Sequence, residues 1–289
     1  MRMTVAFIQR ARDLVLFRTW AGRGLGLRAW VVMALVAWGM ELQVPADTVP
    51  VRHIAGTVHG FLIQRAGDGH VVATGDSVQV SHGDVVTSHT IFTYKDGSVD
   101  DETTVFSQRR TFHLISDHHV QKGPFFPHAM DLAIDTRTGE VTTRTMGKDG
   151  KEAVHTEHMS LPLDLANGIV PEVIGSLSAN SPTMTVSMLV AAPKPRIVKL
   201  AISPRGEENF SIAGAARKAL HCEIKIVIGG VAGAVAPLVG KAPPNIQIWE
   251  VGGDAPTFLR EQGPTFEDGP TMTIELASPE WADGARANG

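Results

Sequence analysis

Thr90–Asp131 reads TIFTYKDGSVDDETTVFSQRRTFHLISDHHVQKGPFFPHAMD, and the alternation in this stretch decides the fold. Apolar and β-branched residues recur at alternate positions on both sides of Asp96 and Gly97, which is typical of strands joined by a tight turn. Pro124 and Pro127 then mark irregular backbone, because proline cannot donate to a central ladder. The stretch predicts two or three successive strands with polar turns.

The same alternation extends outward from this stretch. Short apolar alternations separated by turns of glycine and aspartate run from His53 to His158 and resume from Thr183 to Ala277. Strands this closely spaced favour antiparallel pairing, because parallel pairing needs crossovers of about a dozen residues or more. Between them, Pro162–Ser178 has apolar residues at three- and four-residue spacings, which predicts one or two short helices.

The fold class that follows is mainly β. We expect a curved antiparallel sheet, half-barrel or barrel-like, because curvature manages the sheet edges and leaves a concave face. A short central helical insert near residues 163–178 would cover that face. No internal repeat with a period of about 20–50 residues is evident, which argues against a propeller or a solenoid.

Residues 1–39 are predicted to be a signal peptide or an N-terminal anchor. An uncharged, mostly apolar run of about a dozen residues follows Arg28, which is the length of a signal-peptide core and short of the roughly 20 residues that span a membrane. Ala37 and Gly39 would suit cleavage before Met40. We expect an exported protein of the periplasm or cell envelope, which contacts the membrane only through this segment if it stays uncleaved.

The rest of the chain is then divided into three parts. Residues 40–52 are expected to be a linker, residues 53–278 the β domain, and residues 279–289 a loose tail.

Charge and cysteine content exclude several classes of function. Residues 1–39 contain six arginines and one aspartate, a net charge of +5, so the remaining residues carry −9 against −4 for the whole chain. Such a surface repels phosphate backbones, so no nucleic-acid partner is expected. Cys222 is the one cysteine of the sequence, which rules out an internal disulfide, and its apolar surroundings predict a buried core residue.

Histidines and carboxylates cluster in the C-terminal half of the opening stretch. The candidate metal ligands are His118, His119, His128 and Asp131, since imidazole and carboxylate groups bind zinc and similar divalent ions. In a strand, however, His118 and His119 point to opposite faces, so both could join one site only at a bulge. The alternative is a solvated turn cluster or a set of packed polar pairs, with no cofactor.

Other motifs for chemistry are incomplete. The acidic run that begins at Asp96 resembles the opening of a calcium loop, but Ser107 occupies the position of the bidentate glutamate. The sequence contains no G-x-S-x-G nucleophile elbow, and the glycines at 229–233 lack the lysine of a phosphate-binding loop. We therefore predict no catalytic residue.

An apolar segment rich in glycine and alanine follows Cys222. Ile224–Val239 has no charge after Lys225 and is a poor regular helix because glycines and a proline break it. The segment is either a core strand that enters a buried turn or a flexible loop that touches lipid. In the second case the ligand-binding residues would be Val231, Ala234, Val235 and Leu238.

Four segments resemble those of uncharacterised exported bacterial envelope proteins that are rich in β-structure: DGSVDDETTVFSQ, LISDHHVQKGPFFP, LPLDLANGIV and IQIWEVGG. Some proteins of this class are distantly similar to the half-barrel folds of lipid and lipoprotein carriers. The resemblance implies a β-rich exported fold and no catalytic residues, and fold alone does not fix function.

Three functions are therefore carried forward. The first is a non-enzymatic envelope protein that holds a lipid or acyl chain on a concave sheet face. The second is a metal-binding protein or metal-dependent hydrolase that uses the histidines between residues 113 and 131. The third is an assembly or scaffold protein whose partner is another envelope protein.

Overall fold

The computed structural model describes residues 48–146, 152–191, 194–212, 215–227, 243–252 and 256–277, all of which belong to one compact unit, Gln43–Gly289. Within these residues, fourteen strands form a single sheet. The strands are β1 (Val58–Arg65), β2 (Val71–His82), β3 (Val85–Tyr94), β4 (Val99–Ser107), β5 (His113–Lys122), β6 (Met130–Asp135), β7 (Glu140–Met146), β8 (Glu152–His158), β9 (Met184–Val190), β10 (Arg196–Ile212), β11 (Ala215–Val227), β12 (Ile246–Val251), β13 (Thr257–Pro264) and β14 (Thr271–Leu276).

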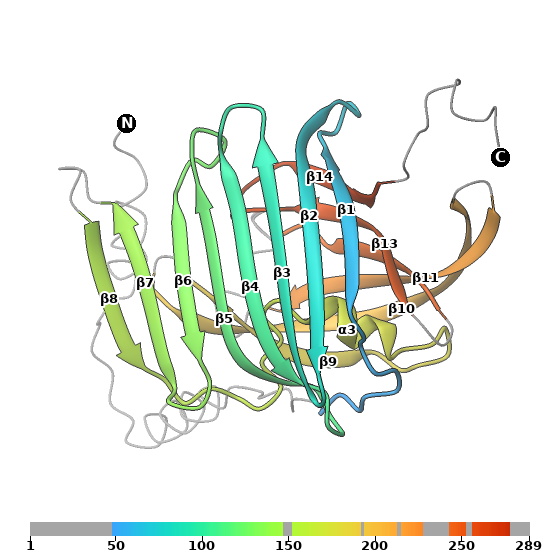
Figure 1. Ribbon diagram of the computed structural model, residues 1–289, viewed down its shortest axis with the longest axis horizontal. Helices are drawn as coiled ribbons and strands as arrows, with labels where there is room; N and C mark the ends of the chain where they lie inside the picture. The colour runs from blue at the N-terminus through green and yellow to red at the C-terminus, as the bar shows by residue number, and fades with distance from the viewer. Residues whose placement is uncertain are drawn as a thin grey trace, which may run out of the picture. The chain divides into compact units, whose positions relative to one another are not determined.

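The sheet consists of two antiparallel meanders. The strands β1–β8 pair in sequence order, as do β9–β14, and the two meanders join where β1 pairs with β14. β8 and β9 lie at the two ends of the strand order, so the sheet is curved without closing. In Figure 1, β1–β8 lie in front of the second meander, and the helix α3 (Val170–Gly175) lies between the two. The expected fold class is confirmed.

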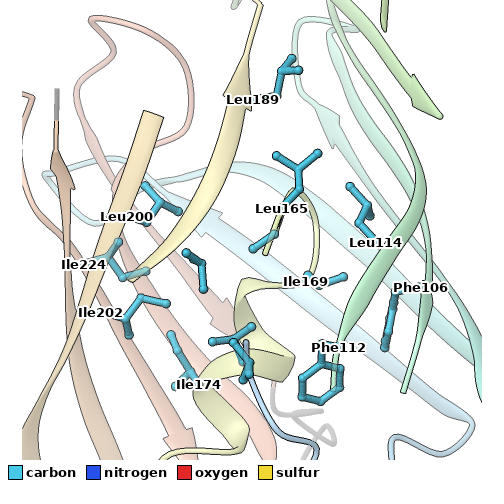
Figure 2. Close-up of a cluster of buried hydrophobic side chains, with 14 of the residues drawn as sticks. Phe106, Phe112, Leu114, Leu165, Ile169, Ile174, Leu189, Leu200, Ile202 and Ile224 are labelled. Carbon is cyan, nitrogen blue, oxygen red and sulfur yellow. The ribbon is translucent and has the colours of Figure 1, made fainter. Parts of the chain in front are cut away.

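The main core lies between the meanders. Apolar side chains from β3–β7, from the insert and from β9–β12 pack into one buried cluster. Figure 2 shows part of this cluster and labels Phe106, Phe112, Leu114, Leu165, Ile169, Ile174, Leu189, Leu200, Ile202 and Ile224. A helix of six residues has little stability of its own, so the burial of Val173 and Ile174 is what holds α3 in place.

The insert also covers the edge strand β9. The Ser187 N–H donates to the carbonyl of Asp164 at 3.1 Å. The Asn167 side chain accepts from the N–H of Leu189 and donates to its carbonyl, both at 2.9 Å. These bonds satisfy backbone groups that an edge strand otherwise presents to other chains.

Gly168 sits at a turn of the insert that requires glycine. Its φ of +64° is in the left-handed region, and a Cβ at this position would lie 1.9 Å from Oγ1 of Thr104 on β4. The glycine therefore allows the insert to approach the sheet closely.

The N-terminal boundary of the packed region differs from the expected one. Residues 48–52, expected as the end of a linker, run along the chain segment before β5. The Val51 N–H donates to the Arg110 carbonyl at 2.8 Å, and the Phe112 N–H donates to the Val49 carbonyl at 3.0 Å. Val49 is buried in the main core, which explains why this segment is held against the sheet.

Two strands continue through residues that are unfavourable or polar. β5 continues through the polar residues up to Lys122, because its alternate side chains pair inside the sheet. β10 runs through Pro204, although proline cannot donate to the ladder. A register shift between Pro204 and Gly206 accommodates the proline, and Gly206 takes a φ of +118° there.

Candidate functional site: an acidic band inside the curve

Residues of β4 and β5 that point into the curve form the first part of the site. Phe106 lies in the main core, and alternate residues of a strand share a face, so Thr104 and Glu102 also point inward. On β5, His119 is in register with Glu102, and Asp117 is in register with Thr104. The inward face of these two strands therefore changes from apolar to polar along its length.

Three further carboxylates reach the interior from other elements. Glu261 of β13 is in register with Ile248, which belongs to the main core. Oε2 of Glu250 lies 3.2 Å from the position that a Cβ on Gly175 of α3 would take. Glu172 lies in the first turn of α3 and acts electrostatically on Glu250. We call the following set of carboxylates the acidic band: Asp100, Glu102, Asp117, Glu172, Glu250 and Glu261.

Glu102 is at the centre of the acidic band. Burial raises its pKa, His119 opposes this rise, and the carboxylates of Asp100, Glu261 and Glu172 raise the pKa further. These neighbours come from β4, β13 and α3, so carboxylates approach Glu102 from several elements. The Glu102 side chain is still 30% exposed, which leaves it accessible to a solute.

His119 is the cationic partner of the band. Its Nε2 lies 2.7 Å from Oδ1 of Asp100, and its Nδ1 lies 3.7 Å from Oε1 of Glu102. Burial disfavours the charged imidazole, but the hydrogen bond with Asp100 and the charges of Glu102, Asp100 and Asp117 outweigh it and raise the pKa to about 9. His119 is therefore a charged imidazolium at neutral pH.

Gln121 connects the band to the second meander. Its side-chain amide donates to Oδ2 of Asp100 at 2.9 Å and to the carbonyl of Thr265, just after β13, at 2.7 Å. Both carboxylate oxygens of Asp100 therefore have a partner, Oδ1 in His119 and Oδ2 in Gln121, which fixes the orientation of its side chain.

Asp117 is the most enclosed member on the first meander. Its side chain accepts a hydrogen bond from the Thr104 hydroxyl at 2.8 Å through Oδ1, and the residue is 2% exposed. Its Oδ2 accepts no hydrogen bond from any residue that the structure describes. Burial, with repulsion from Glu102, raises the pKa of Asp117 to about 7.

The carboxylates on the other side of the interior are also shifted. Burial raises the pKa of Glu172 and of Glu261 to about 7. Burial raises the pKa of Glu250 well above its usual range, and repulsion from Glu172 adds to the shift. Near neutral pH, the acidic band is therefore only partly ionised.

Apolar clusters flank the acidic band on both sides. Along β3, Val86 lies in the main core, Ser88 and Thr90 follow, and Phe92 and Tyr94 belong to a second cluster. In register, Thr90 pairs with Glu102 at the middle of the band. The second cluster is aromatic and contains Phe92, Tyr94, Phe125, Phe126 and Phe266.

The four predicted metal ligands are not brought together at one site, although His118 and Asp131 are in contact. His118 points to the convex face, where its Nε2 lies 3.1 Å from Oδ1 of Asp131, and Arg144 binds the same oxygen at 3.2 Å. His119 points into the curve, because adjacent residues of a strand point to opposite faces and His118 points outward. His128 is exposed in the segment between β5 and β6. Across the described ranges, no group of three or more histidine, cysteine, aspartate or glutamate side chains is arranged to hold a metal ion.

Several other predictions fall outside the part of the chain that the structure describes. These are the ligand-binding residues Val231, Ala234, Val235 and Leu238, the signal or anchor at 1–39 and the tail at 279–289. In the ranges that are described, no helix has the length and apolar character needed to cross a membrane.

Sequence reasoning did not identify Glu172, Glu250 and Glu261 as site residues. Glu172 stands in an otherwise apolar run, whereas Glu261 lies between Arg260 and Gln262. Glu250 follows Ile246 and Ile248 at the spacing of one strand face. A carboxylate at an inward position of an apolar alternation is the signal that could have identified Glu250.

Comparison with known proteins leaves the chain without an assigned family. The chain matches no family model and no curated protein. Among solved structures, it is similar to a β-barrel-like protein of a domain of unknown function, DUF1849, from Brucella abortus. That similarity has a TM-score of 0.43 and 10% sequence identity, and it covers 83% of this chain and 100% of the other.

Proposed function

We propose that this protein is exported to the periplasm or cell envelope and binds a lipid or acyl chain on the concave face of its curved sheet, without catalysing a reaction. The observation that carries the proposal is the order of apolar and polar side chains along that face. Apolar residues at both ends of β3 enclose the polar Ser88 and Thr90, beside the partly exposed Glu102. An amphipathic ligand matches such a surface, because its chain contacts apolar groups and its head contacts polar ones.

The open edge of the sheet supports ligand binding, because it leaves a route by which a ligand could reach the interior. The two end strands, β8 and β9, are not paired with each other, and the insert covers only β9. The head-group side of a ligand would meet Glu102 and His119, whose side chains are 30% and 25% exposed.

The one cysteine of the sequence is not a candidate nucleophile. Cys222 is buried in the main core, and burial raises the pKa of its thiol to about 12. A thiol that stays protonated and enclosed is not a nucleophile at neutral pH.

An envelope assembly role is the second candidate, and one observation favours it. β8 pairs only with β7, and its residues are mostly exposed, including Val154 at 57%. An unpaired edge of this kind can accept a strand from another protein.

Native mass spectrometry of the protein, expressed as the full chain and purified from the envelope without detergent or added metal, tests the proposal. A bound mass that extracts into organic solvent is the expected result. A bare protein that also fails to bind a hydrophobic fluorophore would contradict lipid binding. A co-purifying protein, lost on changing Val154→Lys, would instead favour the assembly role.

A further inference from the structure

The acidic band has more carboxyl groups than cationic partners. Among the ion pairs of the described residues, the band is joined only by His119, which pairs with Asp100 and Glu102. Arginines and lysines with buried or half-buried partners pair outside the band; for example, Arg65 and Arg260 bind Glu275, and Lys199 binds Asp164. One imidazolium therefore stands against six carboxyl groups.

Two of these carboxyl groups are almost completely buried with an oxygen that lacks a protein donor. Asp117 and Glu250 are 2% and 3% exposed, yet Oδ2 of Asp117 and Oε1 of Glu250 accept no hydrogen bond from the described residues. Oε2 of Glu172 likewise has no donor among the described residues. Buried carboxyl oxygens without a donor cost free energy, so their retention in the interior calls for a function.

The unpaired oxygens belong to one connected set of charges. Glu102 acts on Asp117 within the first meander and feels Glu172 on α3, and Glu172 in turn acts on Glu250. Asp117 lies on the same inward face as Glu102, two residues further along the paired strands. The set therefore extends from β5 across α3 to β12, and Glu102 is one of its half-buried members.

We propose that the acidic band binds the primary ammonium group of an amine-bearing amphiphile. This inference rests on the proposed function, because it names the head group of the ligand whose chain the apolar clusters contact. An ammonium group supplies three N–H donors and a positive charge, which is what unpaired carboxyl oxygens require. An anionic head group would be repelled by the same carboxylates, and a neutral one would leave them uncompensated.

Binding of three amphiphiles with the same chain tests this preference. Dodecylamine, dodecanol and dodecanoate are titrated separately, below their micelle concentrations, into the protein expressed as the full chain. We expect dodecylamine to bind about tenfold or more tightly than dodecanol, and dodecanoate to bind most weakly. Spermidine, which has ammonium groups and no long chain, is titrated in parallel and is expected to bind more weakly than dodecylamine.

A matched pair of variants locates the site. Glu102→Gln removes the inward charge, and Asp101→Asn removes the adjacent outward charge on the same strand. Glu102→Gln should abolish the preference for the amine, while Asp101→Asn should retain it. Thermal unfolding of both variants confirms that each is folded.

The outcomes separate the inference from the proposed function. If none of the three amphiphiles binds, the proposed function is wrong. If dodecanol or dodecanoate binds as tightly as the amine, lipid binding stands and the ammonium site is wrong. If Glu102→Gln retains the preference, the site is not the acidic band. If spermidine binds as tightly as dodecylamine, the band binds an ammonium group from a free polyamine, and the lipid proposal is contradicted.

Discussion

Nε2 of His119 lies 2.7 Å from Oδ1 of Asp100, although the two residues are not directly opposite each other in the sheet. His119 is in register with Glu102, so it reaches diagonally to Asp100. Its imidazole ring therefore interacts electrostatically with both carboxylates. This diagonal contact is the shorter of the two charged pairs that His119 makes with the acidic band. The first prediction concerns its dependence on pH.

His119→Gln should destabilise the protein more at pH 6 than at pH 10. The folded pKa of about 9 lies above the value of about 6.5 for a free histidine, so the stabilisation is present below about pH 6.5 and is lost as the pH rises through 9. Urea denaturation at both pH values should give a loss of about 1–3 kcal/mol at pH 6. His118→Gln, on the convex face, is the control, and an equal loss at both pH values would contradict a role for the charge.

The carboxyl groups of the band should make the protein more stable as the pH falls from 8 to 5. The folded pKa values of Asp117, Glu172 and Glu261 are raised to about 7, so the folded state binds their protons more tightly than the unfolded state. The stability gained by protonation is complete below the unfolded values of about 4 and is lost as the pH rises through 7.

Glu172→Gln tests this pH dependence at one residue. The variant should show a smaller change of the unfolding free energy between pH 5 and pH 8 than the wild type, measured by urea denaturation. Asp84→Asn, an exposed acid at the turn between β2 and β3, should leave the slope unchanged. A steeper slope in Glu172→Gln would rule out the assigned burial penalty.

Lys199→Met should destabilise the packing of the insert on β9. Lys199 Nζ donates to Oδ2 of Asp164 at 3.3 Å and to the Ser187 hydroxyl at 2.8 Å, and Asp164 is nearly buried. Removal of the ammonium group leaves a buried carboxylate without its charge partner, at a cost of about 1–3 kcal/mol. Lys122→Met, at the exposed end of β5, serves as the control, and equal stability of the two variants would show that Asp164 does not depend on the lysine.

Gly168→Ala should cost more stability than Gly83→Ala. Both glycines have a φ near +63°, but a Cβ on Gly83 meets no atom within 4 Å, while one on Gly168 would meet the Thr104 hydroxyl at 1.9 Å. Backbone strain alone is worth about 1–2 kcal/mol, and overpacking adds about 1–3 kcal/mol at Gly168. Thermal denaturation measures the difference, which would vanish if the insert did not approach β4.

The alternation of apolar residues predicts the strands because it is a local property. Val86, Phe92 and Tyr94 occupy inward positions of β3, as the pattern around them indicates. The same pattern does not reveal that Leu62 of β1 pairs with Leu276 of β14, because register between distant strands depends on how both meanders curve. The curved sheet was predictable as a class, and the pairing that joins its two halves was not.

The acidic band was hidden from sequence reasoning for a related reason. Glu250 has Glu172 as its electrostatic neighbour, and Glu102 has Glu261, although each pair lies far apart in the chain. The histidines at 118 and 119 drew attention because they are adjacent in sequence, but adjacency in a strand separates side chains to opposite faces. The fold determines which residues lie close across the interior, and such residues have no characteristic spacing in the sequence.

The seam between β1 and β14 also has a kinetic consequence. Arg65 and Glu275, which are 210 positions apart, meet at this seam. Each meander can assemble from neighbouring segments as they emerge, but the seam must wait for the last described strand, because closing so long a loop is slow. Until then the first meander presents β1 and a half-covered apolar face, so the interval before the seam forms is when the chain is most exposed to aggregation and to chaperones.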